Sequence, residues 1–163
     1  LGMRVLAHDL HPTDAGRELA EYVDLDTLYA RADVISLHCN LTPENTGMIC
    51  AASIEKMKDG VLIVNNARGP LINEADLAAA LESGKVGAAA LDVIENEYGL
   101  YYINHTGEAM ANREVALLSA FPNVIVAPHT AFYTDASIRD MARCTVEACR
   151  AFERGESYAF EVR

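Results

Sequence analysis

Short apolar runs recur along the chain and alternate with stretches of helical spacing. Five of these runs predict β-strands, at residues 4–9, 33–38, 61–65, 87–91 and 124–127. Four of the five are apolar throughout instead of alternating with polar residues, which is typical of parallel strands buried on both faces. Because helical stretches separate the strands, the pattern predicts an α/β fold with a doubly wound parallel sheet.

The segments between the strands carry recognisable helix signals. Helices are predicted at residues 25–32, 51–57, 112–120 and about 134–154, and a further one begins after Asn73. Asn73 is a favourable N-cap, and Gly84 is suited to end the same helix. In the last helix, six residues fall on one apolar face: Ile138, Met141, Ala142, Thr145, Cys149 and Phe152.

Composition narrows the class of protein. The 163 residues suit one ordinary domain, and a composition of 51% hydrophobic and 23% charged residues suits a packed core. No apolar run approaches the roughly 20 residues of a membrane helix. A formal net charge of −11 argues against nucleic acid and anionic membrane as partners. The four cysteines lack disulfide or metal spacing, so we expect reduced thiols in a cytoplasmic protein without a metal site.

Polar residues gather where the predicted strands end. They are Asp9, the triplet His38-Cys39-Asn40, and the stretches "NNARGP" (65–70), "DVIENE" (92–97) and "PHT" (128–130). Each alone has an ordinary explanation, as a turn cap, a surface arginine, a solvated loop acid or a loop histidine. Parallel sheets, however, bind ligands at the carboxyl ends of their strands. One arginine, two acids and one histidine there together predict an active site.

These residue types fit chemistry on a small carboxylic acid. An arginine guanidinium grips a carboxylate through two parallel hydrogen bonds, which a lysine cannot reproduce. A histidine can give or take a proton near neutral pH, and a neighbouring carboxylate favours its charged form. The strand ends therefore predict proton-coupled chemistry on a small carboxylic acid.

Three stretches of the chain resemble a known family. They are "DVISLHCNLTPENTGMI", "VLIVNNARGPLINEADLAAALESGKVGAAALDVIENE" and "FPNVIVAPHTAFYTD", in an order and spacing that span nearly the whole chain. Together they are similar to the D-isomer-specific 2-hydroxyacid dehydrogenases. The insertion "YGLYYINHTGEAMANREVALLSA" and the wording "PHTAFYTD" resemble the D-lactate and D-2-hydroxyisocaproate group of that family.

The resemblance implies a role for each catalytic candidate. Arg68 would hold the substrate carboxylate and polarise the keto oxygen. His129 would protonate that oxygen during reduction and remove the proton during oxidation. Glu97 would pair with His129 and is preferred to Glu95, because it stands five residues past Asp92, as in the family.

The resemblance also implies NAD as the cofactor. Asp92 would contact the nicotinamide carboxamide, and Asp9 would accept hydrogen bonds from the adenosine ribose. An acid at Asp9 favours NAD over NADP, because it would repel a 2′-phosphate. The remaining cofactor-lining positions are expected at Cys39, Asn66 and Ala131, beside Arg68 and His129.

The chain also departs from the family pattern. Asn40 stands where the family usually has proline, and Asn66-Ala67 stand where it has Thr-Ser. No two glycines are spaced as G-x-G, so the dinucleotide fingerprint is absent. The chain opens on Leu1 instead of Met, so we expect it to start in mid-protein. The resemblance implies that it is the C-terminal half of a longer protein, which would be a homodimer when complete. Residues 1–132 would then be a partial NAD-binding domain without its first strand and glycine-rich loop. Residues 133–163 would lead back to a substrate domain.

Two alternatives to a dehydrogenase stay open. A non-catalytic NAD-binding or interaction module of the same fold would keep the strands without turnover. A methyltransferase-like domain would also place an acid after a strand, but it does not account for the set of Arg68, Glu97 and His129. The side chain of the substrate is not specified, and ordinary packing is the expected role of Tyr101, Tyr102 and Tyr133.

The missing strand has a structural consequence. In the family order 3-2-1-4-5-6, the first strand lies at the centre of the sheet. Its absence is expected to leave the strands at 4–9 and 61–65 with unpaired edges. We therefore expect the chain alone to self-associate or to re-pair its strands, and to lack reductase activity.

Overall fold

A computed structural model describes residues 2–107, 112–158 and 160–161. Residues 108–111, which belong to the predicted insertion, lie outside this described part. The chain forms two compact units, Leu1–Pro128 and His129–Arg163. The predicted functional division after residue 132 stays a prediction.

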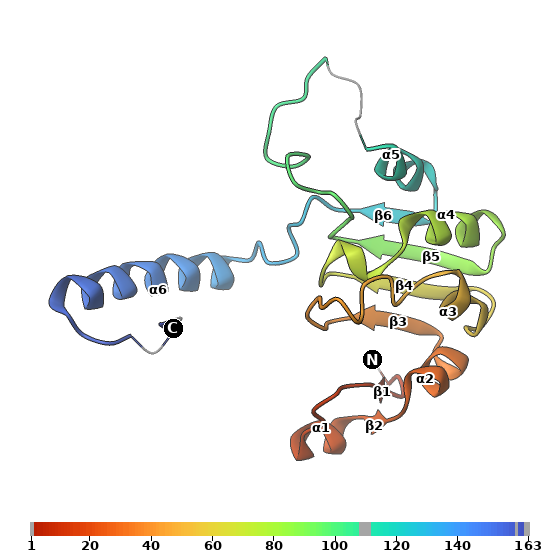
Figure 1. Cartoon of the computed structure of the whole chain (residues 1–163), viewed down its shortest axis with the longest axis horizontal. Helices are drawn as coiled ribbons and strands as arrows, with labels where there is room; N and C mark the ends of the chain where they lie inside the picture. Colours follow the sequence, from red (N-terminus) through yellow and green to blue (C-terminus); the bar gives the residue numbers. More distant parts are fainter. Residues whose placement is uncertain (1, 108–111, 159, 162–163) are drawn as a thin grey trace. The chain divides into compact units, whose positions relative to one another are not determined.

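Four parallel strands form the larger sheet of the first unit (Figure 1). In spatial order they are β3 (Val34–Leu37), β4 (Val61–Asn65), β5 (Val86–Leu91) and β6 (Val124–Val126). Leu37 pairs with Asn65, Asn65 with Leu91, and Leu91 with Val126, so the four carboxyl ends lie side by side. These four predicted strands are confirmed.

A second, two-stranded parallel sheet lies at the start of the chain. It pairs β1 (Leu6–Ala7) with β2 (Glu21–Tyr22), and α1 (Asp14–Leu19) connects them. The strand predicted at 4–9 is thus confirmed only at its centre. The sequence pattern missed α1 and β2, because two strand residues and a six-residue helix carry too little periodicity to register.

The predicted position of one open edge is wrong. β4, at residues 61–65, pairs with β3 on one side and β5 on the other. Because the two-residue β2 leaves no periodic signal in the sequence, the sequence pattern places β4 one strand too early in the family order. In the part of the chain that the structure describes, β3 pairs with β4 alone and β6 with β5 alone, so the larger sheet has its open edges at β3 and β6.

After α1, the helical segments of the first unit are α2 (Leu25–Arg31), α3 (Ala51–Glu55), the 3₁₀ turn η1 (Gly69–Leu71), α4 (Glu74–Glu82) and α5 (Arg113–Ala120). Side-chain caps begin α2, α4 and α5. Asp24, Asn73 and Asn112 each accept a hydrogen bond from the backbone N–H three residues later. Gly84 has a φ of +78° directly after the α4 cap, which confirms the predicted stop.

One face of the larger sheet carries the core. Ile35, Val61 and Ile63 are buried there, together with residues of α3, α4 and α5. On alternate positions Val34 and Leu62 remain 46% and 40% exposed. The second face is therefore less covered, within the described residues, than the continuously apolar runs predict.

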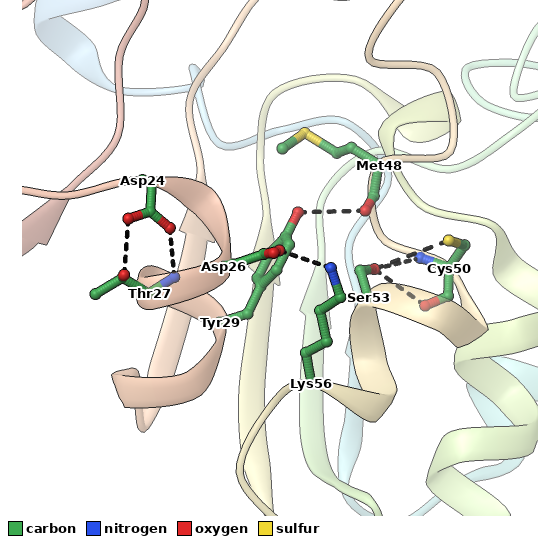
Figure 2. A network of polar contacts seen from close by, with 8 residues as sticks. All are labelled: Asp24, Asp26, Thr27, Tyr29, Met48, Cys50, Ser53 and Lys56. Carbon is green, nitrogen blue, oxygen red and sulfur yellow. Dashed lines mark hydrogen bonds and ion pairs between the residues drawn. The ribbon is translucent and has the colours of Figure 1, made fainter.

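Polar contacts join α2, α3 and the loop after β3 (Figure 2). The Lys56 Nζ lies 2.7 Å from an Asp26 carboxylate oxygen, and the Tyr29 hydroxyl donates to the Met48 carbonyl at 3.3 Å. The exposed ion pair contributes little, about 0–1 kcal/mol. The hydrogen bond from Tyr29 matters more for the candidate site, because it fixes the loop that follows Cys39.

The second unit consists mainly of α6 (Asp135–Arg154). Thr134 caps its first turn and Gly155, with a φ of 69°, ends it, so the predicted last helix is confirmed. Met141 and Phe152, from its predicted apolar face, are 47% and 89% exposed. No helix in the described part of the chain has the length and apolar character needed to cross a bilayer.

Candidate functional site

The end of β4 is folded into a tight polar turn. Asn65 is 1% exposed, and both ends of its amide are bonded within the turn. Its Oδ1 accepts from the Ala67 N–H at 3.1 Å, and its Nδ2 donates to the Arg68 carbonyl at 2.9 Å. The turn therefore fixes the backbone of Arg68, whose side chain is exposed and donates to the Ala67 carbonyl. Asn66 is exposed on the same turn.

This turn lies directly against the segment that follows β5, which we call the 92–97 segment. The Asp92 N–H donates to the Asn65 carbonyl at 2.9 Å. At Gly69 a Cβ would come within 2.0 Å of the Ile94 carbonyl oxygen, so only glycine permits this approach. The structure thus brings the backbone of Arg68 together with the backbone segment that carries Asp92 and Glu97, whereas the roles of these side chains stay a prediction.

The 92–97 segment turns sharply before Glu97. Asp92 is 9% exposed and Glu97 is half-buried. Asn96 has a φ of 53°, a left-handed conformation that asparagine tolerates better than most residues. Burial and the carboxylates of Glu97, Glu74 and Asp92 raise the pKa of Tyr101 to about 12. The Tyr101 ring packs against the core, as expected.

Two residues that the sequence did not single out for function hold this segment. The buried Glu74 carboxylate accepts from the Glu95 N–H at 2.6 Å, and Asn112 Nδ2 donates to the Glu95 carbonyl at 3.2 Å. Burial raises the pKa of Glu74, and the charges of Glu95 and Glu114 add to this rise; against the opposing effect of the Glu95 N–H bond, the resulting pKa is about 7. In the sequence, Glu74 resembles any acid that interacts favourably with the dipole at the start of a helix. No sequence signal therefore distinguishes it as a residue that holds another segment.

Two further cofactor candidates lie at strand ends of the first unit. Cys39 follows β3 and is exposed; its Sγ lies 4.0 Å from the Met48 sulfur and 3.8 Å from Asn45 Nδ2. Asp9 follows β1 and is exposed, and its Oδ1 accepts from the His11 N–H at 2.7 Å. Both positions agree with ligand contact at carboxyl ends, which stays a prediction.

His129 has an unusual backbone. Its φ is 53°, in the left-handed region where non-glycine residues are uncommon and often functional. Glu97 belongs to the first unit and His129 opens the second, so their predicted pairing stays a prediction. Ala131 follows in the second unit and is exposed. Among the described residues, no three His, Cys, Asp or Glu side chains cluster as metal ligands.

Known proteins share both the sequence and the fold. An aromatic 2-oxoacid reductase from Clostridium sporogenes is 42% identical over 150 residues, which are 92% of this chain and 45% of that protein. A D-lactate dehydrogenase from Treponema pallidum (strain Nichols) is 39% identical over 164 residues, covering 100% of this chain and 49% of that protein. The chain thus spans about half the length of the relatives it matches.

Solved structures agree closely. The crystal structure of a Treponema pallidum D-lactate dehydrogenase matches with a TM-score of 0.95 at 38% identity, over 99% of this chain and 49% of that one. A D-lactate dehydrogenase with NAD+ from Lactobacillus jensenii matches with a TM-score of 0.92 at 33% identity, with the same coverage. The model of the family "D-isomer specific 2-hydroxyacid dehydrogenase, NAD binding domain" matches residues 1–131. Strand ends, fold and relatives agree that this chain belongs to the D-isomer-specific 2-hydroxyacid dehydrogenase family.

Proposed function

We propose that this chain supplies the cofactor-binding half of an NAD-dependent oxidoreductase that reversibly reduces a 2-keto acid to a D-2-hydroxy acid. The turn at the end of β4 carries this proposal, because it fixes the backbone of Arg68 against the 92–97 segment with its two proposed site acids. The relatives named as a D-lactate dehydrogenase and an aromatic 2-oxoacid reductase support a small 2-keto acid as substrate.

Each side chain has one task in the proposed reaction. The nicotinamide, when bound, supplies or accepts the hydride. Arg68 holds the substrate carboxylate with a bidentate grip and polarises the keto oxygen. His129 donates a proton to that oxygen during reduction, and Glu97 stabilises the charged imidazole. Asp92 orients the carboxamide of the cofactor.

Cofactor choice rests on Asp9. Its carboxylate follows β1, where the family places the adenosine ribose, and an acid there repels a 2′-phosphate. We propose NAD over NADP on this ground. The proposed cofactor contacts also include Cys39, Asn66 and Ala131, which are all exposed.

The cellular compartment and the oligomeric state are also part of the proposal. All four cysteines are free, which supports a reducing, cytoplasmic setting. A homodimer of the complete protein is proposed from the family resemblance.

A chimeric enzyme tests the function. The N-terminal half of the Treponema pallidum D-lactate dehydrogenase, joined ahead of Leu1, should restore NADH-dependent reduction of pyruvate or of an aromatic 2-oxoacid.

His129→Gln should lower kcat by about 10²- to 10⁴-fold while NADH still binds, because the proton carrier is lost and the pocket remains. Glu97→Gln should shift the pH profile of the chimera. NADH should be preferred to NADPH.

The same experiment separates the alternative. A folded chimera that binds NADH but never turns over would favour a non-catalytic NAD-binding or interaction module. Equal turnover by His129→Gln and the unmodified chimera would contradict the proposed proton carrier.

A further inference from the structure

Glu95 is held at both of its backbone polar groups by side chains from two different helices. Its N–H donates to the Glu74 carboxylate at 2.6 Å, from the first residue of α4. Its carbonyl accepts from Asn112 Nδ2 at 3.2 Å, from the N-cap of α5. We call this arrangement the Glu95 clamp.

Both side chains of the clamp are themselves fixed. Glu74 is 3% exposed, so its carboxylate lacks the freedom of a surface acid. Asn112 uses its Oδ1 to accept from the Val115 N–H at 3.1 Å, which orients the Nδ2 that reaches Glu95. The clamp therefore ties the 92–97 segment to two helix starts that are 17 and 21 residues away in sequence.

The clamp lies next to a residue with an unfavourable backbone conformation. Asn96 follows Glu95 with a φ of 53°, and such a left-handed residue persists when its neighbours are held. Asn96 in turn sets the direction in which Glu97 leaves the segment. On the other side of Glu95, Ile94 is pinned by the close approach of Gly69.

We infer that Glu74 and Asn112 are positioning residues, which fix the 92–97 segment through the Glu95 backbone so that Asp92 and Glu97 are presented in one orientation. The functional part of this inference rests on the proposed function, whereas the clamp itself can be measured without turnover. A buried acid is expensive in a protein interior. Its placement on the one segment that carries two proposed site acids argues for a positioning task.

Amide hydrogen exchange of the whole 163-residue chain, carrying Val34→Lys on the edge strand β3 to limit association, tests the clamp. Glu74→Leu removes the acceptor and should speed exchange of the Glu95 N–H by about tenfold or more relative to the β4–β5 strand amides. Glu74→Gln keeps an acceptor oxygen and should stay within about threefold of the unmodified chain. The amide resonances of residues 92–97 should move in Glu74→Leu and be restored in Glu74→Gln.

A pair of cap substitutions provides the matched control. Asn112→Ser keeps a helix cap but is too short to reach the Glu95 carbonyl, so it should also shift the 92–97 resonances. Asn73→Ser makes the same change at the N-cap of α4. The Asn73 Oδ1 accepts from the Asp76 N–H, so this variant should leave the 92–97 resonances in place. Equal effects of the two serine variants would overturn the inference, as would failure of Glu74→Gln to restore the resonances.

A pH titration keeps the test decisive if Glu74→Leu does not fold. In the unmodified chain, the Glu95 amide resonance should titrate with a midpoint of about 7, following the Glu74 carboxyl. Glu74→Gln should abolish that titration. A Glu95 resonance that follows the Glu74 carboxyl at no pH in the unmodified chain would overturn the inference.

Discussion

Arg68 offers a sharp residue-scale test of the proposed reaction. In the chimeric enzyme, Arg68→Lys should raise KM and lower kcat together, with a loss of about 10- to 100-fold in kcat/KM, because a single ammonium cannot both grip the carboxylate and orient the keto group. Steady-state kinetics with pyruvate would measure this. Unchanged constants would remove Arg68 from the site.

Glu74 makes a second residue-scale prediction, on stability. Its pKa is raised from 4.5 to about 7 in the folded chain, so the folded state favours the protonated form. The raised pKa of Glu74 contributes fully to the free energy of unfolding below about pH 4.5, and this contribution is lost as pH rises through about 7. Glu74→Gln should therefore raise the free energy of unfolding above pH 7 by about 1–3 kcal/mol.

Urea denaturation between pH 5 and pH 8 would measure this difference. Glu82→Gln, at the last residue of the same helix, controls for the loss of one negative charge. A Glu74→Gln variant with the same pH slope as the unmodified chain would contradict the prediction.

At the scale of elements, the contact between η1 and the 92–97 segment depends on Gly69. A Cβ there would lie 2.0 Å from the Ile94 carbonyl oxygen, so the two backbones must separate in Gly69→Ala. We expect a loss of about 1–3 kcal/mol in the free energy of unfolding, as for overpacked cores.

Gly84→Ala is the matched control for this contact. Gly84 has a φ of +78° and nothing within 4 Å of a Cβ, so its substitution costs only backbone strain, about 1 kcal/mol. The measurement is the urea midpoint, together with the amide resonances of residues 92–97. A smaller loss at Gly69 than at Gly84, with those resonances unmoved, would refute the argument.

At the scale of the whole molecule, the open edge of β3 makes a prediction about association. Val34 is 46% exposed on that strand, and unpaired edges recruit other chains. We expect the isolated chain to self-associate at micromolar concentration, to bind NADH poorly and to show no 2-keto acid reductase activity.

Val34→Lys tests the role of the edge. The substitution makes the net charge of −11 less negative, which by itself would favour association. A lower average mass in analytical ultracentrifugation would therefore come from the lysine on β3 and not from the change in net charge. A monomeric, cooperatively melting chain that binds NADH at micromolar concentration and reduces pyruvate would refute the prediction.

Local signals in the sequence determined much of this protein. Alternating strands and helices predicted the parallel sheet, the caps at Asn73 and Thr134 fixed two helix starts, and the motifs at the strand ends predicted the family. These features depend on neighbouring residues, so periodicity, capping and motif spacing suffice to read them.

Only the tertiary structure decided which distant segments meet. The predicted open edge at β4 is paired, and β3 is an edge strand instead. The structure also contains β2, and Val34 and Leu62 are exposed on a face that the apolar runs predicted to be covered. It also placed Glu74 on the Glu95 backbone, 21 residues away. Strand pairing, face coverage and a carboxylate bonded to a distant peptide depend on packing between segments, which no local pattern encodes.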